Sequence, residues 1–140
     1  MPSGPAALEM VVVDTNVIAY LYLPGAQTAA ARRSLLADPD WVAPYLWRSE
    51  LRNVLATYLR GGHVALPEAE AIMAEAERNM MDAEFDVDSA EVLALALESG
   101  ASAYDCEYVA LARRLGIKVL TSDRALLRRF PGDTVDLADA

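Results

Sequence analysis

The sequence predicts an α/β fold in which a mostly parallel sheet of about five short strands is covered by helices on both faces. Short apolar, β-branched runs alternate with longer segments in which apolar residues recur at helical spacing, as expected when helices connect parallel strands. The 140 residues suit a single domain. Because 54% of them are hydrophobic and 24% are charged, the chain is expected to fold rather than remain disordered.

The first half of the chain is expected to contain, in order, a strand at 10–13, helices at about 17–23 and 26–37, a turn at 38–40, a strand at 41–43, and helices at about 44–60 and 67–81. The first strand is a run of Met and Val, typical of a strand buried on both faces. Residues 14–16 end this run and can cap a helix that begins near Val17. Pro44 and Pro67 suit the first turns of the last two helices, and the glycines at 61–62 end the earlier of these.

The second half is expected to contain a strand within 82–88, helices at about 89–99 and 103–115, a strand at 117–120, a short helix at 123–129 and a strand at 134–135. Acidic and apolar residues alternate in the first of these segments, which predicts a strand with one acidic face near a sheet edge. Asp88 and Glu91 have the spacing of a capping box for the next helix. Gly100 and Gly116 are expected to end the two longer helices.

The composition excludes several kinds of protein. The net charge of -9 argues against a basic surface that coats nucleic acid, so a polyanion would have to bind at a local site with metal ions to offset the carboxylates. Cys106 and His63 are the only residues of their types, which excludes an internal disulfide, a multi-cysteine zinc site and chemistry that needs two imidazoles. The single cysteine fits a reducing, cytoplasmic compartment. No stretch predicts a membrane span, and residues 1–9 are expected to be a loose leader before a domain at 10–140.

Two aspartates follow predicted strands. Asp14 comes directly after the first strand, and Asp123 comes after the strand at 117–120. In an open parallel sheet, ligands bind beyond the carboxyl ends of the strands, so both positions are candidates for function. Aspartate is also a preferred helix N-cap residue, and capping is the alternative interpretation for each of them.

Two further carboxylates fall on predicted helices. Glu50 lies at the edge of the apolar stripe of its helix, where a carboxylate must be paired, protonated or bound to a cation. Pairing with a nearby arginine is the structural alternative. Asp105 lies in the first turn of its helix, where the helix dipole alone would stabilise its charge.

These four acids fall within short segments whose order and spacing match a known family. The segments are 12–16 (VVDTN), 49–54 (SELRNV), 102–105 (SAYD) with 108–112 (YVALA), and 120–123 (LTSD). Each segment alone is weak evidence for a family, but four segments in the same order at compatible spacing are strong evidence. The sequence resembles the PIN-domain nucleases, and most closely the VapC toxins of bacterial toxin–antitoxin pairs, from about residue 10 to residue 135.

The resemblance implies a PIN-like three-layer α/β/α sandwich and a metal-dependent endoribonuclease. It implies that Asp14 and Asp105 are the principal metal ligands and that Glu50 and Asp123 complete the acidic site, directly or through water. Carboxylate oxygens without a Cys or His cluster favour Mg²⁺ or Mn²⁺ over zinc. The expected reaction is hydrolysis of an RNA phosphodiester by metal-activated water, leaving 5′-phosphate and 3′-hydroxyl ends.

Other polar residues are expected around the acids. Asn16, Thr121 and Ser122 are candidates to orient the carboxylates, waters or a phosphate, with local capping as the alternative. Four arginines are expected to flank the pocket and bind phosphates: Arg48, Arg52, Arg124 and Arg128. A solvated surface, or pairing with the excess acids of the chain, is the alternative for these arginines.

The resemblance also implies partners. A VapB-like antitoxin would bind the chain and block the site, and the early helices would contribute to a homodimer. The apolar cluster at 20–23 suits such a contact, and a core role suits it equally. The RNA target stays open. Alternative functions are an RNA-processing nuclease outside a toxin pair and a PIN-like RNA- or protein-binding module with little turnover.

Two unrelated functions are disfavoured by single residues. An aspartyl-phosphate hydrolase usually has a second Asp two residues after the first, where this chain has Asn16. A receiver-like phosphoacceptor would have a Lys near the end of its last strand, but the only Lys is Lys118, before the centre of the strand at 117–120. Metal-dependent cleavage of RNA would distinguish a PIN-like nuclease from these alternative functions.

Overall fold

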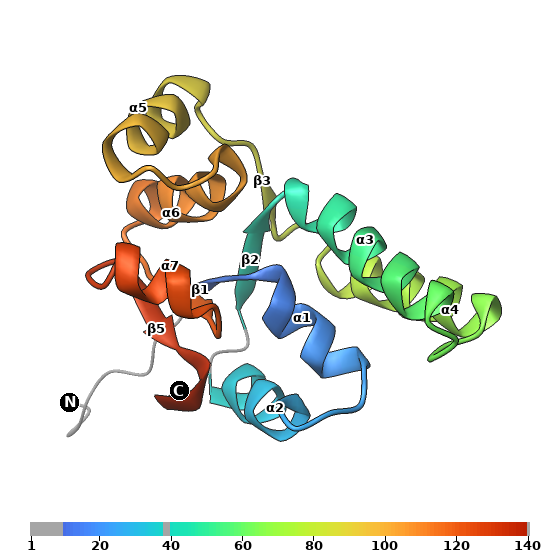
Figure 1. The fold of residues 1–140 in the computed structure, drawn as a ribbon. Coiled ribbons are helices and arrows are strands. Elements are labelled where there is room, and N and C mark those ends of the chain that lie inside the picture. The colour runs from blue at the N-terminus through green and yellow to red at the C-terminus, as the bar shows by residue number, and fades with distance from the viewer. Residues whose placement is uncertain (1–9, 38–39, 140) are drawn as a thin grey trace.

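The computed structural model describes residues 10–37 and 40–139, and within them five strands form one parallel sheet in the order β3-β2-β1-β4-β5 (Figure 1). The strands are β1 (Val11–Val13), β2 (Trp41–Pro44), β3 (Glu84–Phe85), β4 (Val119–Thr121) and β5 (Thr134–Asp136). The helices are α1 (Thr15–Tyr22), α2 (Thr28–Ala37), α3 (Leu46–Arg60), α4 (Leu66–Asn79), α5 (Ser89–Ser99), α6 (Ala103–Leu115), α7 (Arg124–Arg129) and the 3-10 turn η1 (Leu137–Asp139). The predicted α/β class with a sheet of five short strands is confirmed.

The sheet is buried on both faces because successive side chains point into two different cores. Val11 and Val13 pack on one face with apolar side chains from α1, α2, α3 and α4. Val12, between them, packs on the other face with α5, α6 and α7. Figure 1 shows these two groups of helices on either side of the sheet. The molecule is therefore a three-layer α/β/α sandwich, and the continuous apolar runs of the strands follow from double burial.

Two element boundaries differ from the prediction for local reasons. α1 begins at Thr15 rather than near Val17, because the Asp14 carboxylate accepts a hydrogen bond from the Thr15 N–H at 2.8 Å and makes Asp14 the N-cap. Pro44 does not lie in the first turn of α3; it is the last residue of β2 and pairs with Phe85 of the edge strand. Its fixed φ is compatible with an extended chain as well as with a helix start.

The edge strand β3 is shorter than the predicted segment 82–88 and pairs with β2 alone. Its acidic residue does not face solvent, because the Glu84 carboxylate accepts hydrogen bonds from Trp47 Nε1 at 2.8 Å and from Arg48 Nε at 2.6 Å. Asp88 is the N-cap residue of α5, but its side chain makes no capping hydrogen bond. The predicted capping box is wrong, because the hydrogen bond from the Glu91 N–H to the Asp88 carboxylate that it requires does not form.

The remaining expectations concern chain ends and turns. Gly100 and Gly116 end α5 and α6 with φ of 73° and 70°, a left-handed conformation that glycine adopts without a Cβ clash. The predicted leader at 1–9, and residues 38 and 39 of the predicted turn, lie outside the described residues. No helix in the described ranges has the length and apolar character needed to cross a membrane.

The packing of α3 on the sheet can be tested at Leu51, which is fully buried in the larger core. Leu51→Ala is expected to lower the free energy of unfolding by about 2–5 kcal/mol, because it removes buried methyl groups and leaves a cavity. Leu97→Ala is the control, since Leu97 is 89% exposed on α5 and should contribute less than about 0.5 kcal/mol. Urea denaturation followed by circular dichroism measures both, and equal losses would contradict the packing described above.

Candidate active site

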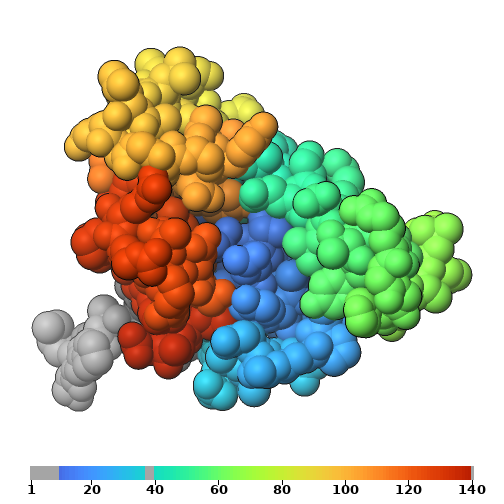
Figure 2. Space-filling view, in the orientation of Figure 1, coloured from blue at the N-terminus to red at the C-terminus, as the bar shows by residue number. Residues whose placement is uncertain are grey.

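Four carboxylates line one pocket of about 420 Å³ at the carboxyl ends of the strands. Parallel pairing of β1 with β4 places Asp14 and Asp123 at the same edge, where the Asp14 N–H donates to the Leu120 carbonyl at 2.9 Å. Glu50 reaches the pocket from α3 and Asp105 from α6. Figure 2 shows the start of the described chain in a hollow bordered by α3 and by the orange-to-red region of α6 and α7. All four acids singled out in the sequence share this pocket.

Asp14 is held at both carboxylate oxygens. Oδ1 accepts from the Thr15 N–H at 2.8 Å, and Oδ2 accepts from the Thr121 hydroxyl at 2.7 Å. Burial, together with smaller contributions from the charges of Glu50 and Asp105, raises the pKa of Asp14 to about 6 despite these hydrogen bonds. The side chain is therefore fixed in position while its ionised form is disfavoured.

Glu50 is held by two hydroxyl groups that the sequence did not identify as part of the site. Its Oε1 accepts from the Tyr108 hydroxyl at 2.5 Å and from the Thr15 hydroxyl at 3.1 Å, and these two hydroxyl oxygens are 2.6 Å apart. Burial raises the pKa of Tyr108, and the nearby Glu50 charge raises it further, so the phenol stays protonated and donates. A sequence signal existed: Tyr108 lies three residues after Asp105, and Thr15 directly follows Asp14.

Asp105 and Asp123 lie at the starts of helices and also line the pocket. The Asp105 N–H donates to the Ser102 hydroxyl, which caps α6, and this leaves the Asp105 carboxylate facing the pocket. Burial raises the pKa of Asp105, and the charge of Asp123 adds to this while Arg129 opposes it. Asp123 itself caps α7, with Oδ1 accepting from the Ala125 N–H at 2.9 Å. A helix-capping role and a position in the pocket are therefore compatible for Asp123.

The donor set suits a hard cation, because carboxylate and hydroxyl oxygens are the ligands that Mg²⁺ and Mn²⁺ prefer. Burial is the main cause of the raised pKa values of Asp14 and Asp105, and the charges of neighbouring acids add to it. Among residues 10–37 and 40–139, no group of three or more Asp, Glu, His and Cys side chains is arranged closely enough to hold a metal ion. The carboxylates thus share a pocket without forming a closed ligand set.

The three polar residues predicted beside the acids take different positions. Asn16 lines the pocket. Thr121 donates to Asp14 and accepts from the Asp123 N–H at 3.0 Å, so it links two of the acids. The Ser122 hydroxyl instead contacts the Tyr20 hydroxyl at 3.0 Å, and Ser122 is not among the residues that line the pocket.

Arg48 forms ion pairs inside the protein. Its Nε and Nη2 bind the Glu84 carboxylate at 2.6 and 2.8 Å, and its Nη1 binds Glu77 at 2.6 Å. These contacts raise the pKa of Arg48 and lower that of Glu84. Arg48 therefore connects α3 to α4 and to β3. The sequence left two possibilities for this arginine, binding phosphate or pairing with acids of the chain, and in this structure it pairs with acids.

The other three predicted arginines lie on the surface, outside the pocket lining. Arg124 pairs with Asp136 at 2.6 Å. Arg52 on α3 and Arg128 on α7 are exposed and form no ion pair within the described part of the chain. Cys106 is fully buried and His63 is exposed, as their sequence contexts predict.

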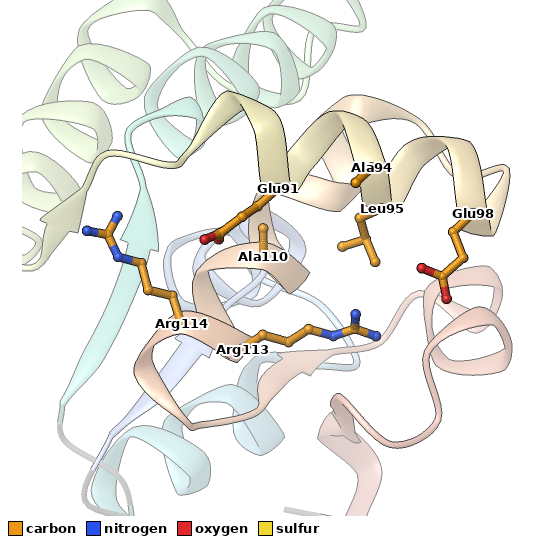
Figure 3. A pocket seen from close by; sticks show the side chains of 7 residues that line it. All are labelled: Glu91, Ala94, Leu95, Glu98, Ala110, Arg113 and Arg114. Atoms are coloured by element: carbon orange, nitrogen blue, oxygen red, sulfur yellow. The ribbon is translucent and has the colours of Figure 1, made fainter.

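A second pocket, of about 340 Å³, lies between α5 and α6 (Figure 3). Glu91 and Glu98 approach it from α5, and Arg113 and Arg114 approach it from α6. Acidic and basic side chains are balanced here, and Arg113 is already bound to Asp133 through two hydrogen bonds. The acidic pocket, with four carboxylates and no basic residue in its lining, is therefore the better candidate for metal-dependent chemistry.

Comparisons with known proteins agree with this fold. The family model of the PIN domain matches residues 11–132. Ribonuclease VapC3 of Pyrobaculum aerophilum is 36% identical over 124 residues, which cover 86% of this chain and 94% of that protein. The crystal structure of PAE2754 from Pyrobaculum aerophilum superposes with a TM-score of 0.74 at 22% identity and covers 93% of both chains. A toxin-antitoxin complex from Klebsiella pneumoniae gives a TM-score of 0.61 at 16% identity, over 91% of this chain and 97% of that one.

The raised pKa of Asp14 predicts a pH-dependent stability in the metal-free protein. Because the pKa is about 6 in the fold against an ordinary 3.8, the protonated carboxyl stabilises the folded state. That contribution is complete below about pH 4 and is lost as the pH rises through about 6. Asp14→Asn lacks this pH-dependent loss of stability. The free energy of unfolding of Asp14→Asn, minus that of the original protein, should therefore be higher at about pH 7.5 than at pH 4, by up to about 3 kcal/mol.

Urea unfolding in the presence of EDTA measures this difference at both pH values. Asp86→Asn is the matched control, since Asp86 is exposed and lies outside the pocket. A difference between Asp14→Asn and the original protein that stays constant with pH would contradict the assigned cause.

Proposed function

The chain belongs to the PIN domain family, and from this we infer that it is a VapC-type endoribonuclease, the toxin component of a toxin–antitoxin pair. The similarity to Ribonuclease VapC3 extends over nearly the whole of both proteins, which supports a shared activity. The observation that carries the proposal is the convergence of Asp14, Glu50, Asp105 and Asp123 on one pocket. These acids come from four separate parts of the chain.

We propose that Asp14 and Asp105 hold Mg²⁺ or Mn²⁺, with Glu50 and Asp123 binding directly or through water. When bound, such a cation offsets the repulsion among the acids, polarises a phosphodiester and lowers the pKa of a water. The protein contributes orientation: Thr121 fixes Asp14, while Tyr108 and Thr15 fix Glu50. Hydrolysis at this site would leave 5′-phosphate and 3′-hydroxyl ends.

Partners follow from the same proposal. RNA is the substrate, and the exposed Arg52 and Arg128, which form no ion pair within residues 10–37 and 40–139, are available to bind its phosphates. A VapB-like antitoxin that places a basic side chain among the carboxylates would complement this pocket. We also propose a homodimer through the early helices, although residues 20–23 also pack against or within the core. The free, buried thiol of Cys106 is consistent with a cytoplasmic protein.

The first test is cleavage of a mixed RNA pool by the purified chain with Mn²⁺. Asp14→Ala and Asp105→Ala should each lower the rate by more than about 100-fold, because even residues that only orient metal ligands contribute 10- to 100-fold. EDTA should have the same effect. Circular dichroism verifies that the variants fold, and Asp86→Ala serves as an exposed acidic control. Cleavage by Asp105→Ala at the original rate would refute the assignment of the site.

The arginines are tested by the salt dependence of RNA binding. Arg52→Ala and Arg128→Ala should each weaken binding and reduce the slope of log affinity against log salt by about 0.7, the value for one phosphate contact with a single strand. Arg32→Ala and Arg33→Ala are the controls, because these arginines are also exposed but lie on α2. An unchanged slope in the Arg52 and Arg128 variants would remove both residues from the phosphate-binding surface.

A further inference from the structure

The acidic pocket has an uncharged wall that the chemistry proposed above does not use. Besides the four acids, Leu46, Ser49, Asn53 and Val54 line it from α3, and Tyr104 lines it from α6. Tyr104 directly precedes Asp105 in the sequence, and Asn53 follows Glu50 by three residues on α3. The same cavity is therefore lined by carboxylates and by neighbouring aromatic, apolar and amide groups.

Tyr104 differs from the tyrosine that supports Glu50. Tyr108 is buried and hydrogen-bonded, whereas Tyr104 is 63% exposed and its hydroxyl has no hydrogen-bond partner within the described residues. An exposed aromatic ring at the rim of a charged pocket has a flat face available for stacking. Stacking against another planar group would bury the apolar surface of the Tyr104 ring that the fold leaves exposed to water.

The residues of α3 in this lining add groups of matching chemistry. Leu46 and Val54 are partly buried and supply apolar contact. Asn53 is exposed, and its side-chain amide forms no hydrogen bond within the described ranges, so both its donor and its acceptor are available. A flat apolar face beside a free amide is the combination that recognises a nucleobase, which has a π-face and a polar edge.

We propose that this wall is a subsite for one unpaired nucleobase of the RNA, next to the phosphodiester held at the carboxylates. The Tyr104 ring stacks on the face of the base, and the Asn53 amide binds its edge. A base inside a duplex has both faces stacked and its pairing edge occupied, so the base bound here is an unpaired one. This inference rests on the proposed ribonuclease function and assigns Tyr104 and Asn53 to substrate binding.

The position of Tyr104 favours RNA over a protein partner as the group that covers it. The ring lies in the same cavity as the four acids, and its backbone is continuous with Asp105. A nucleotide whose phosphate approaches Asp105 carries its base within the reach of this wall, so both contacts come from one ligand.

The test measures binding of a short single-stranded RNA to Asp14→Asn protein with Mg²⁺, so that affinity is read without turnover. In that background, Tyr104→Ala should weaken binding by about 5- to 140-fold, the range for loss of one stacked base, while Tyr104→Trp should retain the affinity. Tyr45→Ala is the matched control, because Tyr45 is 51% exposed but does not line the pocket.

Abasic substitutions at each position of the RNA identify the stacked base. One abasic position should weaken binding to the Asp14→Asn parent and have no further effect on the Tyr104→Ala variant. Undiminished affinity in Tyr104→Ala, or equal effects of every abasic position on both proteins, would overturn the subsite. If Tyr104→Ala binds RNA with undiminished affinity, contact with a protein partner becomes the better explanation for the exposed Tyr104 ring.

Failure of the subsite and failure of the proposed function are distinguishable. A folded chain that does not cleave RNA with Mn²⁺ counts against the ribonuclease itself. A chain that cleaves, and whose Tyr104→Ala variant keeps the original kcat/KM on the same RNA, retains the function and loses the subsite.

Discussion

Parallel pairing of β1 with β4 is the constraint on which the site depends. It places the ends of two strands side by side, so that the Asp14 carboxylate reaches the Thr121 hydroxyl at 2.7 Å and Asp123 borders the same cavity. The helices then approach from the two faces of the sheet, with α3 contributing Glu50 and α6 contributing Asp105. The three-layer architecture thus brings acids from both outer layers to one edge of the middle layer.

The same carboxylates serve folding and the pocket, with opposite effects on stability. As N-caps, Asp14 and Asp123 bind backbone N–H groups that would otherwise be unpaired. Burial of Asp14 near other acids costs free energy at neutral pH, which its raised pKa expresses. Supporting hydroxyls of Thr15, Thr121 and Tyr108 hold the acids despite their repulsion. The proposed cation would offset the electrostatic repulsion that these hydrogen bonds leave in place.

Three arginines of the described residues form ion pairs with acids outside the acidic pocket. Arg48 is bound to Glu84 and Glu77, Arg113 to Asp133, and Arg124 to Asp136. The four carboxylates of the pocket, in contrast, have no basic residue in their lining. Four acids account for only part of the net charge of -9, so acidic residues also outnumber basic ones outside the pocket; what distinguishes the pocket is the grouping of its acids without a basic neighbour.

The sequence alone determined the order of the elements, the double burial of the strands and the four acids at the ends of strands and starts of helices, because apolar periodicity and capping residues are local signals. Local signals also explain its errors, since proline at position 44 suits a strand end as well as a helix start. Only the tertiary structure decided that Arg48 pairs with Glu84, that Tyr108 supports Glu50 and that Tyr104 stays exposed beside Asp105. These facts depend on contacts between side chains far apart in the chain and on the direction in which each helix presents them. Spacing within one helix can place Tyr108 near the face of Asp105, but it does not identify Glu50, on another helix, as the partner of the Tyr108 hydroxyl.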